Sequence, residues 1–145
     1  MIAKIASPGD TGFQGLVEQA GIELNRAERY HVFVSMSVID FSQLADSAGT
    51  RIPEFTERIN SIVSKVIRGC DYATLLDNGS LALLFPETPR QGAEVATRRI
   101  SELARKELRD VIGEVTDTVP VEIASYPDTA GAKTMAAFLK EVAHR

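Results

Sequence analysis

Two short apolar runs near the middle of the chain constrain the fold more than any other feature. They cover residues 72–76 and 81–85, and the four residues between them are Asp77, Asn78, Gly79 and Ser80. An Asn-Gly pair readily adopts the positive φ angles that a tight type I′ turn requires. We therefore predict a β-hairpin with Asn78 and Gly79 as the two central residues of its turn.

Helical and extended patterns alternate on both sides of this hairpin. Residues 32–39 are rich in β-branched side chains and apolar on both faces, which predicts a central strand that ends at Asp40. Residues 119–124 predict another strand, and Pro120 places it at an edge of the sheet or at a strand end. Residues 46–50 are polar, and we expect them to form a flexible loop. Apolar residues recur at three- and four-residue spacing in four segments, which predicts four amphipathic helices: 13–29, 53–67, 88–104 and 135–142.

Particular residues mark the ends of two of these helices. Pro53 lies near the start of the second helix, and Gly69 lies just past its end. Thr88, Pro89 and Gln91 match a capping box, in which Thr88 caps the third helix and Pro89 is its first residue. We expect the second helix to begin near Pro53 and end before Gly69, and the third helix to begin at Pro89.

The predicted order of elements is α-β-α-β-β-α-β-α, with a hairpin inside an otherwise alternating pattern. This order predicts an α/β fold whose mixed β-sheet is flanked by helices. The chain has 145 residues, of which 44% are hydrophobic, and this is enough for one domain with a real core. We expect residues 1–145 to form a single domain, because no repeat or linker interrupts them.

Composition excludes several classes of function. The net charge is −4, whereas DNA, RNA and anionic membranes are usually bound by clustered Lys and Arg, so we expect none of these partners. Cys70 is the only cysteine, and His31 and His144 have no ligand-spaced neighbours, so we expect neither a metal site nor a cofactor. No segment resembles a signal peptide or a membrane span, which favours a cytoplasmic protein.

Four short strings give the chain a resemblance to a known family. They are RAERY at residues 26–30, VID at 38–40, LLFPET at 83–88 and IASYP at 123–127. Their order and spacing resemble those of the GGDEF family, the bacterial diguanylate cyclases that signal through cyclic di-GMP. The resemblance covers residues 13–143, and it implies the nucleotidyl-cyclase type of fold.

The catalytic signature of that family is missing from this chain. The resemblance places residues 77–81, DNGSL, where the family has Gly-Gly-Asp-Glu-Phe. In the family, an acidic residue at the third position and the Asp that ends the first strand hold divalent metals. Here Asp40 is retained, but Gly79 lacks the second carboxylate, Ser80 replaces the Glu that recognises guanine, and Asp77 would repel a triphosphate. We therefore interpret Asp40, Asp77, Asn78, Gly79 and Ser80 as a vestigial active site and expect no cyclase activity. Asp40 also fits a simpler role as a polar residue at a strand end.

A second site of the family has its motif retained. The resemblance places the inhibitory product-binding motif, Arg-x-x-Asp, at Arg68 and Asp71, and its additional arginine at Arg99. Arginine can pair with guanine or phosphate, and Asp can accept hydrogen bonds from guanine, so these residues could bind cyclic di-GMP. The structural alternative is that Arg68 complements a helix end and pairs with Asp71, while Arg99 is solvated.

Three hypotheses follow for the function. The first is a non-catalytic GGDEF-like signalling domain that acts as a cyclic di-GMP receptor through Arg68, Asp71 and Arg99. The second is a pseudoenzyme scaffold that works by self-association or by contact with a signalling protein and binds no nucleotide. The third, which the substitutions favour least, is a residual enzyme or GTP-binding protein that uses Asp40 and Asp77.

Overall fold

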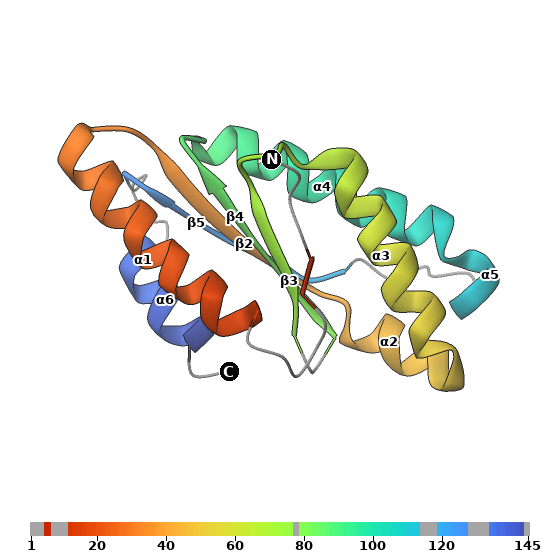
Figure 1. Cartoon of the computed structure of the whole chain (residues 1–145). Coiled ribbons are helices and arrows are strands. Elements are labelled where there is room, and N and C mark those ends of the chain that lie inside the picture. The colour runs from red at the N-terminus through yellow and green to blue at the C-terminus, as the bar shows by residue number, and fades with distance from the viewer. Residues whose placement is uncertain (1–4, 7–11, 77–78, 114–118, 128–133, 144–145) are drawn as a thin grey trace.

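A five-stranded sheet lies between two layers of helices (Figure 1). The computed structural model describes residues 5–6, 12–76, 79–113, 119–127 and 134–143. The strands are β1 (Ile5–Ala6), β2 (Val34–Asp40), β3 (Tyr72–Leu75), β4 (Ser80–Pro86) and β5 (Val121–Tyr126). The helices are α1 (Gly12–Tyr30), α2 (Ser42–Ala48), α3 (Ile52–Val66), α4 (Arg90–Glu107), α5 (Arg109–Ile112) and α6 (Met135–Ala143), and a 3₁₀ turn, η1, spans Gly49–Arg51.

The sheet is mixed, as predicted. Its strand order is β1-β3-β4-β2-β5, in which β1 and β3 are parallel and all other neighbours are antiparallel. The eight predicted elements occur in the predicted order, and the short elements β1, α2, η1 and α5 are additional. Strand β4 lies at the centre and is buried along its whole length, because helices cover both of its faces.

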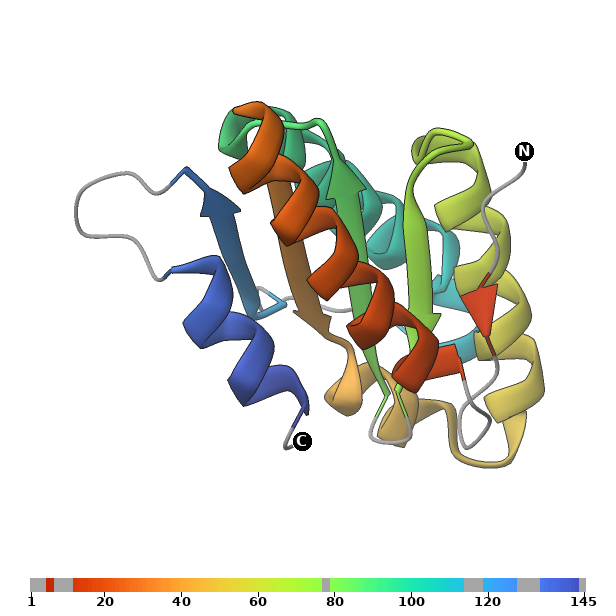
Figure 2. The same ribbon diagram turned by 60° about the vertical axis from the view of Figure 1, so that its left-hand side comes forward.

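Each face of the sheet has its own hydrophobic core. Helices α3 and α4 cover one face, and α1 and α6 cover the other (Figure 2). Side chains of β4 alternate between the two cores, with Leu81, Leu83 and Phe85 on the α3–α4 side and Ala82 and Leu84 on the α1–α6 side. This alternation fixes the register of the strand, since a shift by one residue would exchange the two sets.

The predicted hairpin is confirmed, but its predicted two-residue turn is wrong. The amide of Leu76 donates to the carbonyl of Ser80 at 2.7 Å, so three residues, not two, lie between this closing pair. The Gly79 amide donates to the Leu76 carbonyl at 3.0 Å, and Gly79 has a φ of 91°. These contacts are those of a three-residue loop in which glycine takes the left-handed position. Asp77 and Asn78 lie outside the described residues.

The predicted flexible loop at residues 46–50 is also wrong. Ser42–Ala48 forms α2, and the 3₁₀ turn η1 follows it. Leu44 and Ala48 lie four residues apart on one face of α2, and both are buried in the core beneath α3. Tertiary packing of these two side chains outweighs the low helix propensity of the polar residues around them.

The predicted capping box at Thr88 does not form. Helix α4 begins at Arg90, Pro89 occupies the N-cap position, and no side chain caps the helix. The Thr88 hydroxyl instead donates to the carbonyl of Pro86 at 2.9 Å. The residue that the sequence assigned to the helix therefore belongs to the turn between β4 and α4.

The prediction of an edge strand after residue 119 is confirmed. Strand β5 is the last strand in the sheet order and forms its ladder with β2, and Ser125 of β5 also makes an isolated parallel bridge with Thr134. The carbonyl of Pro120 accepts a hydrogen bond from the Asp40 amide at 2.9 Å. Arg90 donates from Nη1 to the carbonyl of Ile123 in β5 at 3.0 Å. Across the described part of the chain, no helix is long and apolar enough to cross a membrane.

Candidate functional site

The predicted functional residues fall at two opposite ends of the sheet. The carboxyl end of β2 and the β3–β4 hairpin meet at one end, beside α2 (Figure 1). The end of α3, the start of β3 and the start of α4 meet at the other end. Asp40, Gly79 and Ser80 belong to the first end, and Arg68, Asp71 and Arg99 belong to the second.

At the first end, backbone groups of neighbouring residues fix the position of Asp40. Its Cα lies opposite that of Ser80 in the β2–β4 ladder. One oxygen of its half-buried carboxylate, Oδ1, accepts a hydrogen bond from the amide of Ser42 at 3.0 Å. Asp40 thus stabilises the first turn of α2, because a carboxylate satisfies an amide there that has no partner within the helix.

The hairpin packs closely against α2 at Gly79. A Cβ atom at Gly79 would lie 3.0 Å from Cβ of Ala45 and 3.2 Å from Cα of Ser42. Ser80 is buried beside it, with 4% of its surface exposed. The structure therefore brings Asp40, Gly79 and Ser80 close together, while Asp77 and Asn78 lie outside the described residues. In the part of the chain that is described, no three His, Cys, Asp or Glu side chains form a group that could hold a metal ion.

At the second end, Asp71 closes the connection between α3 and β3. Its side chain is 3% exposed, and its Oδ2 accepts a hydrogen bond from the backbone amide of Arg68 at 2.8 Å. The Asp71 amide donates back to the carbonyl of Arg68 at 3.0 Å, and Nη2 of Arg68 donates to Oδ1 at 3.3 Å. Both carboxylate oxygens of Asp71 are thus engaged by Arg68.

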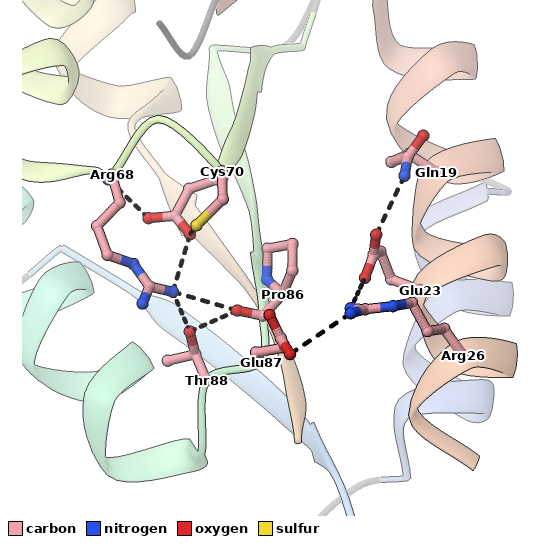
Figure 3. Close-up of polar contacts among 9 residues, drawn as sticks. Gln19, Glu23, Arg26, Arg68, Cys70, Pro86, Glu87 and Thr88 are labelled. Carbon is pink, nitrogen blue, oxygen red and sulfur yellow. Dashed lines mark hydrogen bonds and ion pairs between the residues drawn. The ribbon is translucent and has the colours of Figure 1, made fainter. Parts of the chain in front are cut away.

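The Arg68 guanidinium makes its contacts through one nitrogen. Besides Asp71, Nη2 donates to the carbonyl of Pro86 at 3.1 Å and to the hydroxyl of Thr88 (Figure 3). The hydrogen bond with Asp71 raises the pKa of Arg68 above its usual value, so the group is cationic at every physiological pH. The side chain of Arg68 is nevertheless 57% exposed. The pairing with Asp71 is the one expected from the structural alternative, whereas the contacts with the β4–α4 turn were not expected from the sequence.

Arg68, Asp71 and Arg99 line one pocket. Its volume is about 290 Å³, and its lining combines these three residues with apolar and small side chains: Val66, Phe85, Thr88, Gly92, Val95 and Ala96. The lining thus includes two arginines and one aspartate beside several apolar side chains. The pocket can accept an anion that also carries a flat apolar surface, such as a nucleotide.

Thr88 is a residue of this pocket that sequence reasoning missed. Its pattern with Gln91 matches a helix cap, and only the fold shows that it faces the end of α3. A Cβ on Gly92 would lie 2.9 Å from Cγ2 of Thr88, so the first turn of α4 also packs against this residue. The signal in the sequence was the string LLFPET itself, which the resemblance included without a role for its threonine.

A second set of contacts joins α1 to the turn before α4 (Figure 3). Arg26 lies 3.6 Å from the carboxylate of Glu23 and 3.5 Å from that of Glu87. Glu87 has a positive φ of 51° and immediately precedes Thr88. The contact brings together two of the strings on which the resemblance depends, 26–30 and 83–88.

Comparison with known proteins identifies the fold. No family model matches the chain, and no curated protein matches it. Among solved structures, a diguanylate cyclase protein from Thermotoga maritima superimposes with a TM-score of 0.63 and 14% identity over 96% of this chain and 94% of that one. The GGDEF domain of PA1120 (YfiN or TpbB) from Pseudomonas aeruginosa gives a TM-score of 0.60 and 18% identity over 90% of this chain and 84% of that one. The chain has the GGDEF fold.

Two further structures show the settings in which this GGDEF fold occurs. The GGDEF domain of DgcB from Caulobacter crescentus, solved with c-di-GMP, gives a TM-score of 0.60 and 15% identity over 99% of this chain and 87% of that one. Diguanylate cyclase SiaD from Pseudomonas aeruginosa, solved with its activator SiaC, gives a TM-score of 0.59 and 20% identity over 90% of this chain. The chain spans only 54% of the length of SiaD.

Proposed function

We propose that this chain is a non-catalytic GGDEF-like signalling domain that binds cyclic di-GMP in the pocket formed by Arg68, Asp71 and Arg99. The observation that carries the proposal is that Arg68 and Asp71, from the connection between α3 and β3, line one pocket with Arg99 of α4. Arg99 lies 31 positions after Arg68 in the sequence, so only the fold brings the two arginines to one pocket. The bound c-di-GMP of DgcB, which has the same fold, gives further support for this choice of ligand.

The chemistry of the pocket fits a cyclic dinucleotide. Two arginines offset the two phosphate charges of such a ligand, and hydrogen bonds between guanidinium and phosphate are among the strongest in proteins. Phe85, Val95 and Ala96 provide an apolar surface that a purine can cover. A nucleotide therefore gains both electrostatic and apolar contacts here, although the chain as a whole is acidic.

The absence of cyclase activity is part of the same proposal. Support comes from Gly79, which offers no carboxylate where the family has an acidic metal ligand. Even a Cβ at this position would lie 3.0 Å from Cβ of Ala45 in α2. Asp40, the remaining acid, accepts a hydrogen bond from Ser42. Incubation with GTP and Mg²⁺ or Mn²⁺ should therefore yield no cyclic di-GMP, and its appearance in a chromatographic assay would refute this part.

Isothermal titration calorimetry with cyclic di-GMP tests the receptor proposal. The wild-type protein should bind, and Arg68→Ala and Arg99→Ala should each weaken binding at least about ten-fold, since a charged hydrogen bond contributes roughly 1.5–3 kcal/mol. Arg98→Ala is the matched control, because Arg98 is adjacent to Arg99 on α4 but lines a different groove.

The same titration separates the receptor from the scaffold alternative. No heat at high micromolar cyclic di-GMP, or equal affinity of wild type and Arg68→Ala, would remove the receptor proposal. Sedimentation of the protein over a range of concentrations, with and without nucleotide, would then show whether it self-associates independently of nucleotides.

A further inference from the structure

Arg68 and Asp71, the two residues of the predicted motif, differ in how exposed their side chains are. Asp71 is 3% exposed, and both of its oxygens already accept hydrogen bonds from Arg68. Arg68 is 57% exposed and lines the pocket. Asp71 also lines the pocket, but its carboxylate is buried and both oxygens already accept hydrogen bonds, so the guanidinium of Arg68 is the group that a bound ligand reaches.

The guanidinium is held along one side only. Within the described part of the chain, its hydrogen bonds to Asp71, Pro86 and Thr88 all leave from Nη2. A guanidinium is a rigid plane with five N–H donors, so fixing Nη2 also fixes the directions of Nε and Nη1. Both edges on which a guanidinium can pair bidentately, Nε with Nη2 and Nη1 with Nη2, include the occupied Nη2. Nε and Nη1 therefore remain for a ligand as two separate single donors.

Thr88 is the part of this arrangement that a single substitution can remove cleanly. Its hydroxyl donates to the carbonyl of Pro86 and accepts from Arg68, so it links the β4–α4 turn to the end of α3 (Figure 3). The methyl group of Thr88 packs near Gly92. Valine keeps this methyl group and loses the hydroxyl, whereas serine keeps the hydroxyl and loses the methyl group.

We infer that Thr88 and Asp71 are positioning residues, which fix the Arg68 guanidinium through Nη2, so that the pocket recognises the phosphates of a cyclic dinucleotide and not its guanine. The inference rests on the proposed function for its ligand. It differs from the expectation drawn from the resemblance, in which Asp71 accepts hydrogen bonds from the base. Asp71 then offers the base no acceptor, Arg68 has no bidentate edge free for O6 and N7 of guanine, and under the proposed function Arg99 pairs with phosphate. Cyclic di-AMP and cyclic di-GMP should therefore bind with similar affinity, because their phosphates are identical.

The first measurement is made on the free protein. The ¹⁵N relaxation of the Arg68 Nε–Hε group reports whether its side chain is fixed on the picosecond to nanosecond timescale. In the wild type this group should be as rigid as the backbone, whereas the exposed Arg98 should be mobile. Thr88→Val and Asp71→Asn should make Arg68 mobile, and Thr88→Ser should leave it fixed.

The second measurement compares ligands by calorimetry. Wild type should bind cyclic di-GMP and cyclic di-AMP within about five-fold of each other, since a base-specific pair would discriminate by roughly ten-fold or more. Thr88→Val should weaken both ligands about five- to ten-fold, as expected when one fixing hydrogen bond is lost, and Thr88→Ser should restore both.

The outcomes separate this inference from the proposed function. An Arg68 side chain that is mobile in the wild type overturns the inference whatever binds. So does a preference for cyclic di-GMP above ten-fold that Asp71→Asn abolishes while Arg68 remains fixed. If Arg68 is fixed and Thr88→Val releases it, but neither dinucleotide binds, the positioning role stands and the proposed function fails. Thr88→Val keeps the test decisive if Asp71→Asn does not fold.

Discussion

At Gly79, both the backbone conformation and the neighbouring atoms disfavour any residue with a side chain. Its φ of 91° disfavours every L-amino acid with a Cβ, and that Cβ would lie 3.0 Å from Ala45. We expect Gly79→Ala to lower the free energy of unfolding by about 2 kcal/mol, from the cost of the left-handed conformation and the contact. Urea denaturation followed by circular dichroism measures this.

A matched control for this substitution is available in α1. Gly15 lies in a helix, and a Cβ there would meet nothing within 4 Å. Gly15→Ala should therefore raise the free energy of unfolding by about 0.5–1 kcal/mol, because alanine favours the helix more than glycine does. Equal effects of the two substitutions would show that the hairpin does not adopt this conformation.

The residue scale also shows where the sequence was informative and where it was not. Asn78 and Gly79 predicted a hairpin correctly, because turn chemistry is local. The length of the loop depended on which residues of β3 and β4 face each core, and an Asn-Gly pair carries no information on that. Thr88 was misassigned for the same reason, since its hydroxyl can satisfy a helix or a neighbouring arginine equally well.

At the scale of elements, one ion pair joins α3 to the short helix α5. Arg58 donates from Nη1 and Nη2 to the two oxygens of Asp110 at 2.8 and 2.6 Å. The hydrogen bond with Arg58 lowers the pKa of Asp110, and that with Arg51 lowers the pKa of Glu54. These contacts lie on the surface, so salt and solvent screen them.

These lowered pKa values predict how stability depends on pH. Where a carboxyl group has a lower pKa folded than unfolded, the unfolded state binds more protons between the two values. Stability should therefore be fully present above the ordinary pKa, near pH 4, and fall as the pH drops through the folded-state values. Thermal unfolding between pH 6 and pH 2 should show this loss.

Arg58→Met tests whether this ion pair contributes to the loss. Without Arg58 the pKa of Asp110 returns toward its ordinary value, so the stability of the variant should change less steeply with acid pH than that of the wild type. Arg98→Met is the control, because Arg98 forms no ion pair among the described residues, and its profile should parallel the wild type. Identical slopes for all three proteins would contradict the assignment.

At the scale of the whole molecule, the sheet separates the two sites. Strand β4 runs from Ser80 at the hairpin to Pro86 at the Arg68 pocket. Seven residues of extended chain span about 20 Å at roughly 3.3 Å per residue. Asp40, which lies opposite Ser80, is therefore too far from the pocket to contact a ligand there.

Asp40→Ala tests this separation. Loss of the hydrogen bond to the Ser42 amide should lower the free energy of unfolding by about 1 kcal/mol, as for other helix caps. The affinity for cyclic di-GMP should remain within about two-fold of wild type in the same calorimetric assay. A large loss of affinity in a fully folded Asp40→Ala protein would show that the two ends of the sheet are coupled.

Local chemistry in the sequence determined the kinds of elements, their order and the mixed sheet. Periodicity reports which side chains a helix or strand must bury, and Pro120 marked an edge because proline cannot donate to a neighbouring strand. The sequence also supplied Arg68, Asp71 and Arg99 through the resemblance, although their spacing alone could not show that they share a pocket.

Only the tertiary structure decided how those residues are arranged. The polar segment that contains Leu44 and Ala48 is helical because these two side chains pack into the apolar core. The approach of β4 to the end of α3 placed Thr88 against Arg68 and buried Asp71. Hydrogen bonds between residues 18 and 20 positions apart depend on how strands and helices pack, and no local pattern encodes that packing.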